Sequence, residues 1–189
     1  MSLEQLIICH CAPVLRGIKV SNLVSCSCAD YPDFDRELSE FSARIKPFGL
    51  ECRVLCKCKK FALTFVYRKK ELEQLLAQES VASFLMCSGY TAETAEGLLA
   101  ELSERLSVCN GFPHEIGIFL GYPLEDVIGF TQNQGRNFKY SGYWKVYGDP
   151  EKAKVMFSNY SICTEECSLL AMNGGTVEQV IMNAELKTA

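Results

Sequence analysis

Apolar residues recur with a helical period in several stretches of the chain. Between residues 34 and 45 they stand at positions i, i+4, i+7 and i+11, the spacing that puts side chains on one face of an amphipathic helix. The stripe consists of Phe34, Leu38, Phe41 and Ile45. Pro32-Asp33 precede it, and Pro47 and Gly49 follow it. The pattern therefore predicts a helix that begins after Asp33 and ends before Pro47.

Strict alternation replaces this period in residues 50–58. Alternate apolar and charged positions are typical of a half-buried strand, whose side chains point to opposite faces with period two. The predicted inner face consists of Leu50, Cys52, Val54, Cys56 and Cys58. Residues 61–67 are rich in aromatic and β-branched types, which predicts a second strand and a β-hairpin over about 50–67 with a turn near Lys59. A further strand is expected at 22–26.

Other stretches predict helices. Ser2 with Gln5 forms a capping-box pattern, which predicts a helix to about His10 that ends before Ala12-Pro13. Leucine-rich stretches predict one or two helices within 72–85 and another that begins at Thr91 and ends at 109–111. Asp149-Pro150 indicates the start of a C-terminal helix, and residues 173–175 break the helical pattern that follows.

Glycines and prolines punctuate residues 111–130 more clearly than any other region. Pro113 fits the first position of a short helix, Gly121 fits the left-handed position that closes it, and Pro123 opens the next. This spacing also occurs in DNA-reading helix–turn–helix motifs. The second helix, however, begins with Glu125 and Asp126, which would repel phosphates, so nucleic acid is not an expected partner. We predict a packed helical hairpin, followed by an aromatic strand over 143–147.

Together these elements predict an α+β fold, with a small sheet of three or four strands covered by several helices. A chain of 189 residues that is 48% hydrophobic is long and apolar enough for one core, and no repeat or linker interrupts it. We therefore expect a single domain over residues 1–189. No apolar run approaches the roughly 18 residues of a membrane helix, and the first residues lack the basic region of a signal peptide. The expected location is cytoplasmic, without membrane contact.

Eleven cysteines are the most distinctive feature of the composition. Their number is odd and the chain shows no export signal, which argues against a disulfide framework. Three pairs are spaced C-x-C and two C-x3-C, but none has the C-x2-C spacing usual in structural zinc sites. We favour buried, apolar roles for most of these thiols, and a structural metal site built from the C-x-C pairs stays an alternative. No cofactor is predicted, because neither a glycine-rich phosphate loop nor an H-E-x-x-H motif occurs.

Several blocks of the sequence resemble a bacterial family described as a domain of unknown function. The first comprises Cys11-Ala12-Pro13, Gly17-Ile18-Lys19 and Asn22-Leu23. The second runs from Pro113-His114-Glu115-Ile116-Gly117 through Phe119-Leu120-Gly121-Tyr122-Pro123 to Glu125-Asp126-Val127, and the third contains Gly142 and Trp144-Lys145-Val146-Tyr147-Gly148-Asp149. Tyr143 departs from the cysteine that the family often carries there. The resemblance implies a small intracellular bacterial protein but no activity, and it directs attention to residues 10–22, 113–126 and 142–149.

The leading hypothesis is a protein that binds a small ligand or a protein partner in a cleft formed by these three segments. Lys19 would offer charge to an anion, Ser21 and Asn22 would offer hydrogen bonds, and Trp144 would offer a stacking surface. The other predicted ligand-binding residues are Glu115, Tyr122 and Lys145. An alternative is a thiol-dependent enzyme or redox protein in which Cys11 is the reactive thiol and His114 its base.

Overall fold

The computed structural model describes residues 1–108 and 112–185 and confirms the α+β class. The chain divides into two compact units. Unit 1 comprises Met1–Glu71 and Ile162–Ala189, and unit 2 comprises Leu72–Ser161. The expectation of a single domain stays a prediction.

Unit 1 is built around a three-stranded antiparallel sheet in the order β1-β3-β2. Its strands are β1 (Ser21–Ser27), β2 (Leu50–Lys57) and β3 (Phe61–Arg68). Its other elements are α1 (Leu3–Leu15), α2 (Phe34–Ile45), η1 (Lys46–Phe48), α9 (Val177–Glu185), the start of α3 (Lys69–Leu76) and the C-terminal part of α8 (Pro150–Met172). The β2–β3 hairpin confirms the one predicted over about 50–67.

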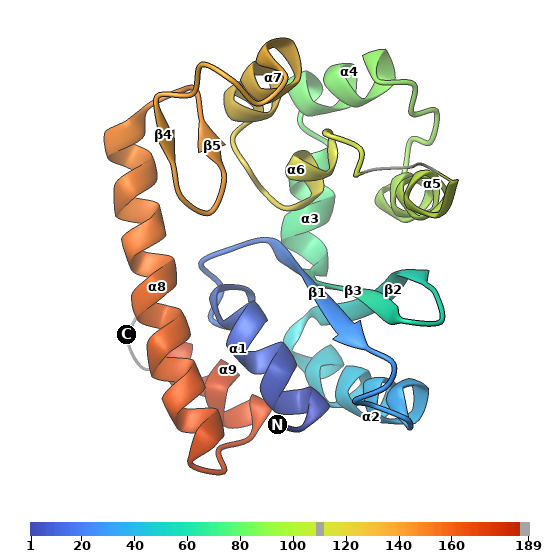
Figure 1. Cartoon of the computed structure of the whole chain (residues 1–189), viewed down its shortest axis with the longest axis vertical. Coiled ribbons are helices and arrows are strands. Elements are labelled where there is room, and N and C mark those ends of the chain that lie inside the picture. The colour runs from blue at the N-terminus through green and yellow to red at the C-terminus, as the bar shows by residue number, and fades with distance from the viewer. Residues whose placement is uncertain (109–111, 186–189) are drawn as a thin grey trace. The chain divides into compact units, whose positions relative to one another are not determined.

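Helices α1, α2 and α9 pack with one face of this sheet to form a core (Figure 1). All four residues of the predicted stripe on α2 are buried in it. The C-terminal part of α8 contributes Cys163 and Cys167 to the same core. This helix ends at Met172, as the predicted break at 173–175 requires, and Gly174 there adopts a left-handed φ of 83°.

The predicted end of the first helix is wrong, because α1 continues through Pro13 to Leu15. A proline so near the end of a helix removes one hydrogen bond, to the carbonyl four residues earlier, and the last carbonyls find other donors. Pro13 O accepts from the backbone N–H groups of residues 18 and 19 at 2.9 and 3.0 Å. Arg68 donates to the carbonyls of Val14 and Leu15 at 2.7 and 2.9 Å. Burial of Cys11 through Leu15 against the sheet adds to this stabilisation.

The predicted inner face of β2 is correct only for its first half. Residues 50, 52 and 54 lie on the face that packs against α1 and α2, but the register with β3 shifts between Val54 and Cys56. Leu55 is the extra residue of this β-bulge and is buried. An inserted residue reverses which face the later side chains take, so Cys56 pairs with Leu63 on the opposite face.

The residues after the bulge show the same reversal. Lys57 pairs with Ala62 and forms an ion pair with Asp35 on α2 at 2.7 Å. It therefore lies on the inner face, where the sequence pattern predicts Cys56 and Cys58. Cys58 lies beyond the strand in the turn and is exposed. A continuous row of cysteines on one strand face is therefore not formed.

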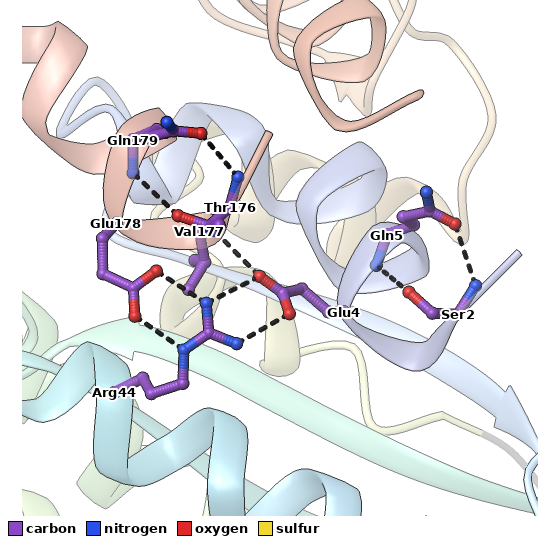
Figure 2. A network of polar contacts seen from close by, with 8 residues as sticks. All are labelled: Ser2, Glu4, Gln5, Arg44, Thr176, Val177, Glu178 and Gln179. Atoms are coloured by element: carbon purple, nitrogen blue, oxygen red, sulfur yellow. Dashed lines mark hydrogen bonds and ion pairs between the residues drawn. The ribbon is translucent and has the colours of Figure 1, made fainter. Parts of the chain in front are cut away.

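An ion-pair network joins three helices of unit 1 (Figure 2). Arg44 on α2 donates to both carboxylate oxygens of Glu178 on α9, at 2.6 Å each, and to both of Glu4 on α1, at 2.7 and 3.0 Å. Glu4 also accepts from the backbone N–H of Val177 at 2.9 Å. The hydrogen bonds from Arg44 hold the pKa of Glu178 at about 2, below its ordinary 4.5. Beside it, Ser2 and Gln5 form the predicted capping box.

Unit 2 is mostly helical and carries a short β-hairpin. Its elements are most of α3, α4 (Glu79–Cys87), α5 (Ala95–Val108), α6 (Ile116–Phe119), α7 (Leu124–Asn133), β4 (Tyr140–Ser141), β5 (Lys145–Val146) and the N-terminal part of α8. Strands β4 and β5 pair antiparallel in a sheet of their own, and β5 contacts α7 (Figure 1). Asp149 caps α8 as predicted, accepting from the backbone N–H groups of Glu151 and Lys152 at 2.9 and 3.2 Å.

Two predicted helix starts in unit 2 are wrong. Thr94, rather than Thr91, caps α5 and accepts from the backbone N–H of Gly97 at 3.1 Å. The hydroxyl of Thr91 instead donates to Glu101 at 2.8 Å. Pro113 opens a turn in which its carbonyl accepts from the N–H of Ile116, at 3.1 Å, and α6 begins only at Ile116. The predicted end of α5 at 109–111 lies outside the described residues.

Candidate functional site

A cavity of about 410 Å³ opens in unit 2 between the α6–α7 pair and the β4–β5 hairpin. Two of the three segments singled out in the sequence, 113–126 and 142–149, contribute to it. Four predicted site residues line it, namely His114, Tyr122, Trp144 and Lys145. Its other aromatic lining residues are Phe112, Phe130 and Tyr143.

The α6–turn–α7 segment places one wall of the cavity. Gly121 closes α6 in the left-handed conformation with a φ of 73°, as predicted, and Pro123 stands immediately before α7. Gly117 permits close approach within this hairpin, because a Cβ there would lie 2.9 Å from Val127 and 3.0 Å from Tyr122. The sequence thus brings Tyr122 to the cavity through a glycine-closed turn.

A tight turn between β4 and β5 places the adjoining wall. The N–H of Gly142 donates to the carbonyl of Trp144 at 3.0 Å, which reverses the chain and turns the indole inward. Trp144 stacks on Tyr122 with ring centroids 4.6 Å apart and contacts Phe157 edge-on at 4.5 Å. Trp144 is 8% exposed, and these ring contacts make its indole a fixed aromatic surface at the cavity.

Asp126 on α7 ties the two walls together. It is 3% exposed, and its carboxylate accepts three hydrogen bonds. The indole N–H of Trp144 donates to Oδ2 at 2.7 Å, and the backbone N–H groups of Tyr147 and Gly148 donate to Oδ1 at 2.7 and 2.8 Å. These bonds also explain why the aromatic strand predicted over 143–147 is short, since the N–H groups after Val146 bond to a carboxylate rather than to a neighbouring strand.

Lys145 brings a positive charge to the cavity. Its Nζ donates to the carbonyl of Gly135 at 2.7 Å and lies 5.1 Å from the ring centroid of Phe138 and 5.7 Å from that of Phe130. Both rings favour a cation at these distances. His114 contacts Phe130 edge-on at 5.0 Å and is exposed.

Glu115 does not line the cavity. Its carboxylate forms an ion pair with Arg105 on α5 at 3.0 Å, and the Arg105 guanidinium lies 3.9 Å from the ring centroid of Tyr90. This arrangement gives Glu115 a structural partner, and its predicted contact with a ligand stays a prediction.

The other predicted site residues belong to unit 1, where they lie close together and are mostly buried. Lys19 Nζ donates to Asn22 Oδ1 at 2.7 Å, and Asn22 Nδ2 donates to the carbonyl of His10 at 2.5 Å. Lys19 is 7% exposed and Ser21 is fully buried. Burial lowers the pKa of Lys19 to about 8. Because these residues and the cavity belong to different units, a cleft shared by all three segments stays a prediction.

Cys11 lacks the surroundings of a reactive thiol. It is fully buried, and this burial raises the pKa of its thiol although the nearby Lys19 lowers it. A nucleophilic thiolate requires the opposite shift and access to solvent. Cys11 and His114 belong to different units, so the dyad stays a prediction.

The described cysteines are all free, and none of them gathers with other ligand types into a cluster of three or more that would suit a metal ion. Cys163 and Cys167 lie one turn apart on α8, and both are buried. Interactions with Cys163 and with the Arg16 guanidinium lower the pKa of Cys167, although burial raises it. None of the helices described is long and apolar enough to cross a membrane.

Sequence reasoning missed the role of Asp126. Its position in the first turn of a helix is typical of an exposed acid, so the sequence indicates only a charge that would repel DNA. Phe130, Ser141 and Tyr143 also line the cavity without having been predicted to do so. One feature of the sequence pointed to a link between these segments, because residues 113–127 and 142–149 both carry the family resemblance. The hydrogen bond between Asp126 and Trp144 joins the two segments directly.

Comparisons with known proteins place the whole of this site in one family. The family model described as "Protein of unknown function (DUF3793)" matches residues 7–181, which include every lining residue of the cavity. Neither a curated protein nor a solved structure matches the chain. Since the match spans most of the sequence, the chain belongs to the DUF3793 family of proteins of unknown function.

Proposed function

We propose that the protein binds a small molecule in the cavity of unit 2. The observation that carries this proposal is the cavity itself, about 410 Å³ in volume, with largely aromatic walls and a few polar groups that converge on it. Sites for small ligands have this size and composition in most proteins.

The fixed geometry of the walls supports the proposal. Trp144 is held by a stacked ring, an edge-on ring and a hydrogen bond, so it loses little further freedom when a ligand covers it. Asp126 fixes the hairpin to α7 with three hydrogen bonds, of which the one from the Trp144 indole is buried. A site that is formed in advance costs less conformational entropy on binding than one that must be assembled.

We also propose a cytoplasmic location. The chain has eleven cysteines, and those that the structure describes carry free thiols. Free thiols in such number persist in a reducing compartment, where glutathione and thioredoxin keep them from pairing.

Trp144 makes the test direct, because it is the single tryptophan of the sequence and lies in the cavity wall. The experiment titrates a set of small aromatic acids, amines and neutral compounds while recording tryptophan fluorescence. Ser141→Phe places a ring at an exposed position that lines the cavity. Ser158→Phe places the same ring at an exposed position on α8, outside the cavity.

We expect saturable changes of Trp144 emission with the wild-type protein and with Ser158→Phe, and at least about tenfold weaker binding with Ser141→Phe. Equal binding by both variants would contradict the proposal, because the ligand would then occupy another surface. Failure of every compound to change the emission saturably would also contradict it.

A further inference from the structure

We propose that the ligand is a flat aromatic anion whose charged group is bound by Lys145. This inference rests on the proposed function and adds the chemical class of the ligand. It follows from the charges at the cavity and from the shape of its walls.

Lys145 is the source of uncompensated charge. Its one hydrogen bond among the described residues goes to a neutral carbonyl, that of Gly135, and no described carboxylate forms an ion pair with it. An ammonium group carries three donors, so two of them remain for other acceptors. The rings of Phe130 and Phe138 hold the ammonium in place, because they attract the cation without supplying an acceptor.

Asp126 is the one acid among the described lining residues, and it is not available to balance Lys145 or to attract a cationic ligand. Its two oxygens already accept three N–H donors at 2.7–2.8 Å, and the residue is buried. The charge of this carboxylate is stabilised by these donors inside the protein. At the described lining of the cavity, an anion therefore meets an ammonium group that no carboxylate neutralises, whereas a cation meets only a carboxylate whose oxygens already accept hydrogen bonds.

The walls select for a flat aromatic ligand. Tyr122 and Trp144 are stacked on each other, and the exposed rings of Phe112 and Tyr143 stand at the cavity, with exposed fractions of 57% and 45%. Aromatic side chains pair with flat rings in offset or edge-on arrangements. His114 is exposed beside Phe130, where it offers a ring nitrogen to a polar substituent.

A matched pair of fluorescent probes separates the contribution of the charge from that of the rings. Anilinonaphthalene sulfonate is a flat aromatic anion, and N-phenylnaphthylamine has the same ring system without the sulfonate. Lys145→Met removes the ammonium and keeps an unbranched side chain. Lys139→Met is the control, because Lys139 is an exposed lysine of the same region that donates to a carbonyl, that of Gly148 at 2.8 Å, but does not line the cavity.

We expect Lys145→Met to weaken binding of the sulfonate probe at least about tenfold, the usual value of a charged hydrogen bond, and to leave the neutral probe within about twofold. Unchanged binding of the neutral probe shows that the cavity of this variant is intact. Lys139→Met should leave both probes unchanged.

Failure of the proposed ligand class and failure of the proposed function give different results. If Ser141→Phe abolishes binding of both probes but Lys145→Met weakens neither or weakens both equally, the class of ligand is wrong and the proposed function stands. If Ser141→Phe affects neither probe, or neither binds the wild-type protein, the proposed function itself fails.

Discussion

Replacing the carboxylate of Asp126 with a carboxamide should destabilise the protein strongly. Asp126→Asn keeps the size and shape of the side chain and removes its charge. In the folded protein this carboxylate is 3% exposed and accepts hydrogen bonds from the Trp144 indole and from the backbone N–H groups of Tyr147 and Gly148. A carboxamide has one acceptor oxygen, and its NH₂ group necessarily faces at least one of these donors.

The structure gives the size of the effect. A hydrogen bond to a charged group contributes about 1.5–3 kcal/mol, and a buried donor left without an acceptor costs about 1–3 kcal/mol. If the Asn oxygen accepts from the N–H groups of Tyr147 and Gly148, the Trp144 N–H loses its acceptor. The other two hydrogen bonds are then made to a neutral oxygen instead of a charged one. We therefore expect a loss of about 3 kcal/mol in the free energy of unfolding. For a chain of this size that corresponds to a fall in Tm of about 9 °C.

The measurement is unfolding in urea, followed by Trp144 fluorescence and by far-ultraviolet circular dichroism. Glu125→Gln is the matched control, since Glu125 is the neighbouring acid on α7 and is exposed. We expect this control to stay within about 0.5 kcal/mol of the wild type. A similar small change for Asp126→Asn would refute the reasoning, because it would mean that Asp126 does not join α7 to the hairpin.

Two further predictions concern unit 1. The pKa of Glu178 is lowered to about 2 in the folded protein, so its contribution to stability is present above about pH 4.5 and is lost as the pH falls from there toward 2. Arg44→Met should lower the free energy of unfolding by about 1 kcal/mol at pH 7 and should reduce the loss of stability between pH 5 and 3. Urea unfolding at each pH measures both effects. An unchanged dependence of stability on pH in this range would contradict the prediction. In limited alkylation read by mass spectrometry, Cys58 should react well before Cys11, because Cys58 is exposed with a pKa lowered by backbone hydrogen bonds, whereas burial raises that of Cys11. Equal labelling in the native state would contradict the described burial.

Periodic segments could be predicted from the sequence because burial alone determines their pattern. The stripe on α2 is buried at all four expected positions, since this face of the helix packs into the core with α1, α9 and the sheet. The β2–β3 hairpin could also be predicted, because the aromatic and β-branched residues in 61–67 form the central strand of the three-stranded sheet. In each case local pattern and tertiary burial agree.

Two local features could not be predicted in this way. The β-bulge at Leu55 arises from pairing with β3, and a leucine after Val54 gives no sign of an inserted residue. The passage of α1 through Pro13 depends on donors far along the chain, among them the side chain of Arg68. Both features depend on tertiary partners, which a pattern of apolar positions does not contain.

The candidate site was predicted in part. The aromatic hairpin and the glycine-closed turn identified Tyr122 and Trp144, which stack on each other in the cavity wall. Asp126 was missed because its local position is typical of an exposed acid, and only the packing of the hairpin against α7 buries it. Cys11 was favoured for its neighbours in sequence, but a helix face turned into the core makes a thiol inert rather than reactive.

The central claim, that the cavity of unit 2 binds a small aromatic molecule, is tested most directly by a crystal structure of the protein with anilinonaphthalene sulfonate. We expect the naphthalene ring to lie in the cavity against the Tyr122–Trp144 wall, with a sulfonate oxygen within hydrogen-bonding distance of Lys145 Nζ. A probe bound elsewhere on the protein, with the cavity unoccupied, would contradict the claim.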